Sequence, residues 1–167
     1  QQAKLDKEPG FSIATWPQRP ESSGWVRVKS ADPFDKPVIQ PNYLSSEKDQ
    51  RVLISGIKLS RKIMNNSALA KYFSHEVYPG EHIYSEEELL EVARNRSTTT
   101  YHVMGTCRMA PLERDSTAVV DEKLRVYGLS NLRVIDASVM PMIPSANINA
   151  AVLAIAEKGA HMILSDS

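Results

Sequence analysis

Closely spaced prolines divide the first forty or so residues into short extended runs, and this limits what the chain can fold into. Proline cannot donate a hydrogen bond to a sheet and is confined to strand ends, edges and bulges. Residues 11–16 and 24–30 alternate apolar and polar side chains, and residues 38–39 form a third short run. In the second run, Trp25 and the basic side chains would share one face. These runs predict at least three short strands in a largely antiparallel sheet.

A different periodicity begins at residue 49. The apolar side chains from 49 to 64 recur close to every 3.6 residues, with basic residues between them, which predicts an amphipathic helix. Residues 67–73 are expected to form a short helical turn. Ser85 is followed three residues later by Glu88, just before an apolar run, which is the pattern of a capping box. We therefore expect a helix that starts at Ser85 and ends near Arg96.

The last third of the chain predicts one more strand and one more helix. Residues 131–136 read as a short apolar strand that ends in Asp136. Residues 147–164 have apolar positions on one side and read as a long helix. Its start carries Asn147 and Asn149, and asparagine is a good N-cap. Two readings stay open: one of these asparagines caps the helix, or the helix start faces a group that becomes negative during a reaction.

Composition narrows the classes of function. Twenty basic residues balance twenty acidic ones, which argues against nucleic acid or an anionic membrane as principal partner. No apolar run approaches the roughly 20 residues of a transmembrane helix. The four histidines lack zinc-site spacing, so no metal is expected. The single cysteine, Cys107, cannot form an internal disulfide, which favours the cytoplasm slightly. The start at Gln1–Leu5 lacks a methionine and a signal pattern, so we expect a fragment or processed chain.

Tyr101-His102 is the candidate for acid–base chemistry. Imidazole exchanges protons near neutral pH, so a histidine in a loop can act as a general base. A single histidine equally serves as a structural residue, and the residues alone leave both readings open.

An ordered series of motifs indicates a family resemblance. The series consists of Gly24–Val28, Ser30–Pro33, Pro41–Leu44, Tyr101-His102-x-x-Gly105-Thr106-Cys107-Arg108-Met109, Ala118–Asp121, Leu124–Leu129, Asn131–Pro141, Asn147-x-Asn149 and Ala156–Lys158. This succession resembles the C-terminal region of the glucose–methanol–choline (GMC) oxidoreductases, especially members of the choline dehydrogenase and alcohol dehydrogenase type. The resemblance covers nearly the whole chain.

The resemblance implies a reaction and roles for individual residues. GMC oxidoreductases oxidise the CH–OH group of an alcohol by hydride transfer to N5 of FAD. His102 matches the active-site histidine that takes the hydroxyl proton, and Asn147 matches the second active-site position, which is histidine in some members. Tyr101 would contact the substrate oxygen or serve packing. The matching FAD contacts are Asp136, Ala137, Asn147, Ile148, Asn149 and Ala150.

The resemblance also implies the fold and a partner. The expected class is α+β, with an antiparallel sheet backed by helices as in the GMC substrate domain. Residues 1–100 would belong to the substrate domain, and residues 101–167 would carry the histidine loop plus a strand and helix of the FAD domain. The G-x-G-x-x-G fingerprint that holds the ADP part of FAD does not occur in the chain. We therefore expect an N-terminal FAD-binding half as partner, an inactive isolated chain and a possible oligomer.

Two alternatives stay open at this stage. A GMC-fold protein can perform other chemistry, such as that of a hydroxynitrile lyase or a flavin photoenzyme. The chain can also be a non-catalytic folded fragment or binding module.

Overall fold

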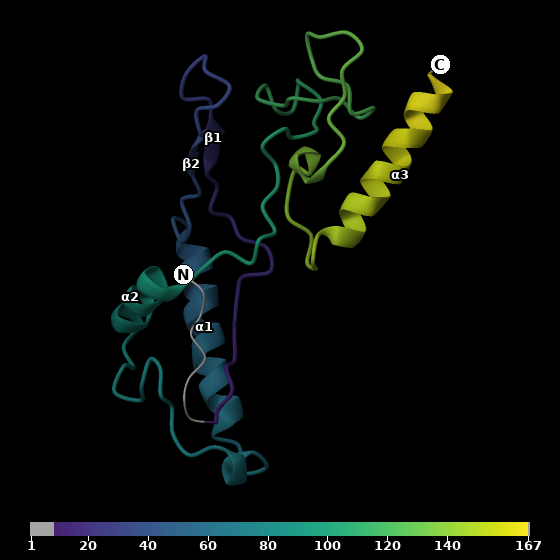
Figure 1. The fold of residues 1–167 in the computed structure, drawn as a ribbon. Helices are drawn as coiled ribbons and strands as arrows, with labels where there is room; N and C mark the ends of the chain where they lie inside the picture. Colours follow the sequence, from purple (N-terminus) through teal and green to yellow (C-terminus); the bar gives the residue numbers. More distant parts are fainter. Residues whose placement is uncertain (1–8, 167) are drawn as a thin grey trace. The chain divides into compact units, whose positions relative to one another are not determined.

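The computed structural model describes residues 9–166, so the predictions made from Gln1–Leu5 lie outside the described residues. Figure 1 shows the order of the elements. They are β1 (Trp25–Arg27), β2 (Val38–Gln40), α1 (Glu47–Met64), the 3₁₀ turn η1 (Ala70–Tyr72), α2 (Glu86–Arg96), the 3₁₀ turn η2 (Ala137–Val139) and α3 (Asn149–Ser165). Helices accompany a two-stranded antiparallel sheet, which confirms the α+β prediction.

The chain forms two compact units. Among the described residues, the first unit combines residues 9–17 with Glu47–Ser97, and the second combines Gln18–Ser46 with residues 98–166. The predicted division near residue 100 concerns the domains of a whole family member and stays a prediction.

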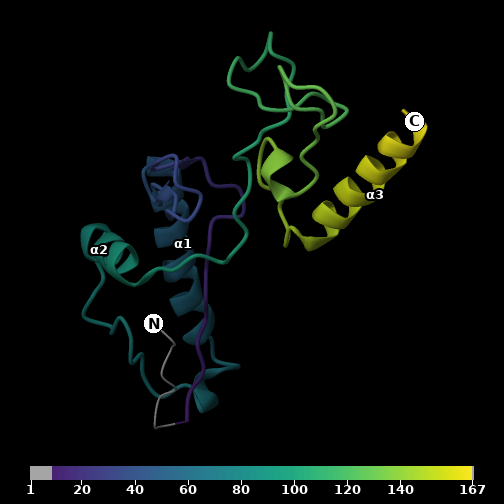
Figure 2. The ribbon, with the colours of Figure 1, turned by 45° about the horizontal axis from the view of Figure 1, so that its top comes forward.

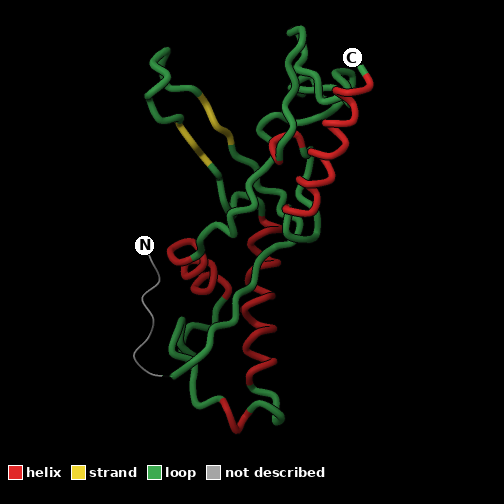
Figure 3. The backbone as a smooth tube through the Cα atoms, turned by 45° about the vertical axis from the view of Figure 1, so that its right-hand side comes forward, coloured by secondary structure: helices red, strands yellow, loops and turns green. Residues whose placement is uncertain are grey.

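Strands β1 and β2 form a hairpin in the second unit (Figure 3). Trp25 is paired with Gln40 and Arg27 with Val38. The Arg27 guanidinium lies 4.7 Å from the centre of the Trp25 ring, which confirms that these two side chains share a face.

The prediction of a strand at residues 11–16 is wrong. A strand needs a neighbour that pairs with its backbone groups, and no described strand lies beside this run. The run instead contacts α1, where Thr15 lies so close to Gly56 that a Cβ added to this glycine would be 2.0 Å from the Thr15 hydroxyl oxygen.

Helices α1 and α2 provide the apolar core of the first unit. Leu53, Ile54 and Met64 of α1 are buried, as are Leu89 and Ala93 of α2. Helix α1 begins two residues earlier than predicted. The predicted turn near residue 70 is confirmed as η1.

The predicted capping box at the start of α2 is confirmed. The Ser85 hydroxyl accepts from the Glu88 N–H over 3.2 Å, and the Glu88 carboxylate accepts from the Ser85 N–H over 3.0 Å. The hydrogen bond from the Ser85 backbone is the main reason that the pKa of the Glu88 carboxyl lies below its ordinary value. The two residues thus satisfy each other's free polar groups at the helix start.

Val120, Leu124 and Val139 form the buried core of the second unit. The strand predicted at 131–136 is absent from the described structure, where Arg133 makes one isolated bridge with Arg125. Pairing stops there because Asp136 turns the backbone into η2.

Helix α3 packs on this core and begins at Asn149, two residues later than predicted. In Figure 2, α3 is the yellow helix that ends the chain. Ile155 contacts the core, and Gly159 is buried against Ile135, whose methyl carbon Cγ2 would be 2.7 Å from a Cβ at position 159. Leu153 and Leu164 on other sides of α3 are exposed. Among residues 9–166, no helix is both long enough and apolar enough to cross a membrane.

Candidate functional site

The predicted catalytic histidine lies in a loop of the second unit. Tyr101 has a left-handed backbone (φ 63°), and its N–H donates to the Thr99 hydroxyl over 2.9 Å. Its ring is 81% exposed, so in this chain the ring is free for an external contact. His102 follows directly and is half-buried. A residue with positive φ other than glycine is uncommon, and such backbones gather at functional sites.

The loop after His102 is tied to the segment after Asp136. The Cys107 N–H donates to the Ser138 carbonyl and the Met109 N–H donates to the Val139 carbonyl, each over 2.9 Å. Gly105, with φ 85°, lies where a Cβ would be 3.3 Å from the Met140 carbonyl oxygen. These contacts bring two predicted regions together: the histidine loop and the Asp136–Ala137 segment.

Arg108 holds the same loop from its other side. Its Nε donates to the Asp115 carboxylate over 3.2 Å, and its Nη2 donates to the Thr117 hydroxyl over 2.7 Å. The Asp115 carboxylate also accepts from the Thr117 hydroxyl, which is the main cause of its lowered pKa. The guanidinium therefore connects both ends of the 105–117 loop.

Asp136 has a local structural role. Its carboxylate accepts from the Ser138 N–H over 2.7 Å and from the Ser138 hydroxyl, and so caps η2. Ala137 is half-buried at the first position of η2. Ser138 is absent from the residues predicted from the sequence, although an aspartate followed two residues later by serine is a recognisable turn signal.

The prediction that Asn147 or Asn149 caps the last helix is wrong. The N-cap position falls on Ile148, whose side chain has no acceptor, and the structure shows no side-chain cap there. Asn147, Asn149 and Ala150 are exposed, and Ile148 is half-buried. The first N–H groups of α3 are therefore left without a side-chain acceptor, at the end of the helix that favours negative charge.

His102 and Asn147 both belong to the second unit, but no hydrogen bond joins them in the described part of the chain. Arg19 does contact the loop that precedes Asn147, because its Nε donates to the Ser145 hydroxyl over 2.5 Å. This contact was not predicted, because 126 positions separate the two residues and no local pattern indicates it.

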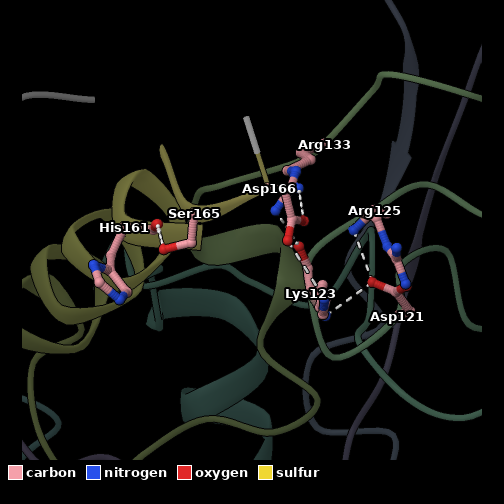
Figure 4. A network of polar contacts seen from close by, with 7 residues as sticks. All are labelled: Asp121, Lys123, Arg125, Arg133, His161, Ser165 and Asp166. Carbon is pink, nitrogen blue, oxygen red and sulfur yellow. Dashed lines mark hydrogen bonds and ion pairs between the residues drawn. The ribbon is translucent and has the colours of Figure 1, made fainter. Parts of the chain in front are cut away.

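A charged network fixes the C-terminal end of α3 (Figure 4). The Asp166 carboxylate accepts from Arg133 over 2.6 Å and from Lys123 over 3.4 Å, and the hydrogen bond from Arg133 is the main cause of its lowered pKa. Burial opposes ionisation of the nearby Asp121, but hydrogen bonds, first of all from Arg125, bring the pKa of its carboxyl below the ordinary value. This network supports α3 and includes none of the predicted site residues.

An apolar groove of about 290 Å³ also lies against α3. It is lined by Met109, Glu122, Leu124, Val139, Met140, Pro141, Ala154, Ile155, Lys158 and Met162. None of the predicted site residues lines it, so its volume does not mark the predicted chemistry. Within residues 9–166, no three His, Cys, Asp or Glu side chains are grouped as a metal site would require.

Comparison with known proteins gives consistent matches. Residues 20–156 match the family model described as GMC oxidoreductase. The chain is 42% identical over 155 residues to the alcohol dehydrogenase [acceptor] of Pseudomonas putida. The aligned region covers 93% of this chain and 28% of that protein. It is 43% identical over 157 residues to the mitochondrial choline dehydrogenase of Homo sapiens, covering 94% of this chain and 26% of that protein.

A solved structure matches the fold. It is a variant of the formate oxidase of Aspergillus oryzae RIB40, studied for its FAD modification, with a TM-score of 0.79 and 36% identity. The match covers 89% of this chain and 26% of that chain. The present chain thus spans about a quarter of the length of the relatives it matches.

Proposed function

Because the chain belongs to the GMC oxidoreductase family, we propose that it carries the catalytic base of an FAD-dependent enzyme that oxidises the CH–OH group of an alcohol. The observation that carries this proposal is the identity of 42–43% to an alcohol dehydrogenase and a choline dehydrogenase, over at least 93% of the chain. The ordered loop around half-buried His102 supports it.

The residues present suit FAD. The start of α3 has free N–H groups and small or amide side chains, which can receive the electron-rich pyrimidine side of a flavin. The carboxylate of Asp136 is engaged by Ser138, so the backbone of Asp136–Ala137 is the part suited to the diphosphate and ribitol. In the proposal, the pyrimidine side of the flavin is held by Asn147, Ile148, Asn149 and Ala150. The diphosphate and ribitol are held by Asp136 and Ala137. When bound, FAD supplies the hydride acceptor, its N5 atom.

In the proposal, His102 and Asn147 have different roles toward the alcohol. His102 accepts the hydroxyl proton as the carbon gives up its hydride, which is general base catalysis. Asn147 cannot titrate, so it donates a hydrogen bond from its amide to the alcohol oxygen and orients it. Exposed Tyr101 lies next to the base and can touch the same oxygen.

A partner is part of the proposal. Residues 1–100 would line the substrate side and residues 101–167 the flavin side, while a further segment supplies the dinucleotide fingerprint that this chain lacks. The proposal therefore concerns the full-length flavoprotein, and the isolated 167-residue chain is expected to be inactive and not to retain FAD.

Flavin reduction provides the test. The full-length flavoprotein is mixed anaerobically with choline and with other alcohols, and loss of the oxidised flavin absorbance is followed. His102→Ala should slow the reduction by about a hundred- to ten-thousandfold. His161→Ala is the matched control, because His161 is an exposed histidine of the same unit and should leave the rate unchanged. A bound flavin that no alcohol reduces would contradict the proposed reaction.

A further inference from the structure

The loop that carries Asn147 has little to hold it. Within residues 9–166, no backbone–backbone hydrogen bond involves residues 141–147. The helix that follows has no side-chain cap, and Asn147 itself is exposed. Within the described residues, neither a backbone hydrogen bond of this loop nor a helix cap therefore fixes the position of the Asn147 amide.

One side-chain contact ties the loop to a remote segment. The Arg19 Nε donates to the Ser145 hydroxyl over 2.5 Å, two residues before Asn147. Both residues belong to the second unit. Prolines lie on each side of the contact and restrict the backbone there: Pro20 follows Arg19, and Pro144 precedes Ser145. This restriction lowers the conformational entropy that the two residues lose when they meet.

We propose that Arg19 is a positioning residue that holds the 141–147 loop through Ser145 and thereby sets the place of Asn147. The contact acts on the loop, and Arg19 itself touches neither the alcohol nor the reacting atoms. The effect on the reaction rests on the proposed role of Asn147, whereas the hold on the loop is a property of the chain itself.

Hydrogen exchange of the full-length flavoprotein tests the hold without reference to activity. Arg19→Ala and Ser145→Ala should each raise amide exchange in a peptide covering residues 141–151. Arg114→Ala is the matched control, because Arg114 is an exposed arginine of the same unit that makes no side-chain hydrogen bond within the described residues, and it should leave this peptide unchanged. Unchanged exchange in both Arg19→Ala and Ser145→Ala would overturn the proposal.

Flavin reduction then tests the consequence. At saturating alcohol, the rate constant per bound flavin should fall about three- to tenfold in Arg19→Ala, a modest loss because both side chains are exposed. Expressing the rate per bound flavin removes the effect of a less stable protein. Ser145→Thr keeps the acceptor hydroxyl and should stay close to the unmodified protein, and Arg19→Lys should recover part of the rate.

A double-mutant cycle separates the proposed path from a general disturbance. If Arg19 acts through Ser145, Arg19→Ala combined with Ser145→Ala should be no slower than the worse single variant. Additive losses would show that the two residues act independently and would overturn the proposal. If His102→Ala and Asn147→Ala both leave flavin reduction intact, the proposed function fails, and the exchange experiment still decides whether Arg19 holds the loop.

Discussion

The backbone N–H of Cys107 donates to the carbonyl oxygen of Ser138 over 2.9 Å, and this bond joins two segments that lie far apart in the sequence. One segment follows His102 and the other follows Asp136. A second bond, from the Met109 N–H to the Val139 carbonyl oxygen, joins the same two segments over 2.9 Å. The proposed base and the proposed flavin contact are thereby placed in one framework.

Arg108 should be needed for the order of this framework. Its fork to Asp115 and Thr117 needs two donors in a fixed plane, so Arg108→Lys should not replace it. We expect both Arg108→Ala and Arg108→Lys to lower the thermal midpoint of the chain by about 2–4 °C and to raise amide exchange in residues 105–117. Arg114→Ala serves as control. Full protection in Arg108→Lys would show that charge alone is sufficient.

Gly159 should be needed for the docking of α3. A Cβ at this position would be 2.7 Å from Ile135 Cγ2, which costs more than the gain in helix propensity from glycine to alanine. Gly159→Ala should therefore lower the free energy of unfolding by about 1 kcal/mol, measured by urea denaturation. Adding Ile135→Ala removes the clashing methyl group, so the Gly159→Ala change should then cost nothing further. A stabilising Gly159→Ala would contradict the tight contact.

The Arg133–Asp166 contact should make stability depend on acid pH. The pKa of Asp166 is lowered in the folded chain from its ordinary value of 3.8, chiefly by the hydrogen bond from Arg133. A lowered carboxyl pKa contributes stability that is present above 3.8 and is lost as the pH falls through the folded-state pKa. Asp166→Asn should thus melt at a lower temperature than the unmodified chain at pH 7, and the difference should shrink at pH 3. Glu157→Gln, an exposed change on the same helix that leaves the Arg133–Asp166 contact in place, is the matched control.

Asn147 should contribute to the rate of flavin reduction in the full-length flavoprotein. Removing a donor that binds a reacting oxygen typically costs about a hundredfold or more, so Asn147→Ala should slow reduction by about that factor. Asn147→His should retain more activity, because histidine restores a donor at this place. Stopped-flow absorbance at saturating alcohol measures both rates. Equal rates in Asn147→Ala and the unmodified protein would remove Asn147 from the proposed mechanism.

Local patterns were sufficient for the elements that depend on neighbours in the sequence. The capping box needs only Ser85 and Glu88, three residues apart, and it forms as predicted. The helix α1 and the short turn η1 were likewise predicted from the residues within each segment. The ordered motifs from Gly24 to Lys158 also sufficed to predict the family.

Strands and caps required the tertiary structure. The alternation at residues 11–16 satisfies the pattern of a strand, yet pairing depends on a neighbouring strand, and here the run lies against Gly56. The asparagines before α3 satisfy the pattern of a cap, yet the backbone places Ile148 at the capping position.

The sequence by itself thus determined which segments form α-helices and the family to which the chain belongs, since helix periodicity and motif order can be read from the residues alone. The tertiary structure alone decided that Cys107 meets Ser138, that Arg19 meets Ser145 and that Gly159 rests on Ile135. Each of these contacts joins residues that are distant in the sequence. Such contacts form only when the intervening chain has packed its side chains and paired its backbone groups.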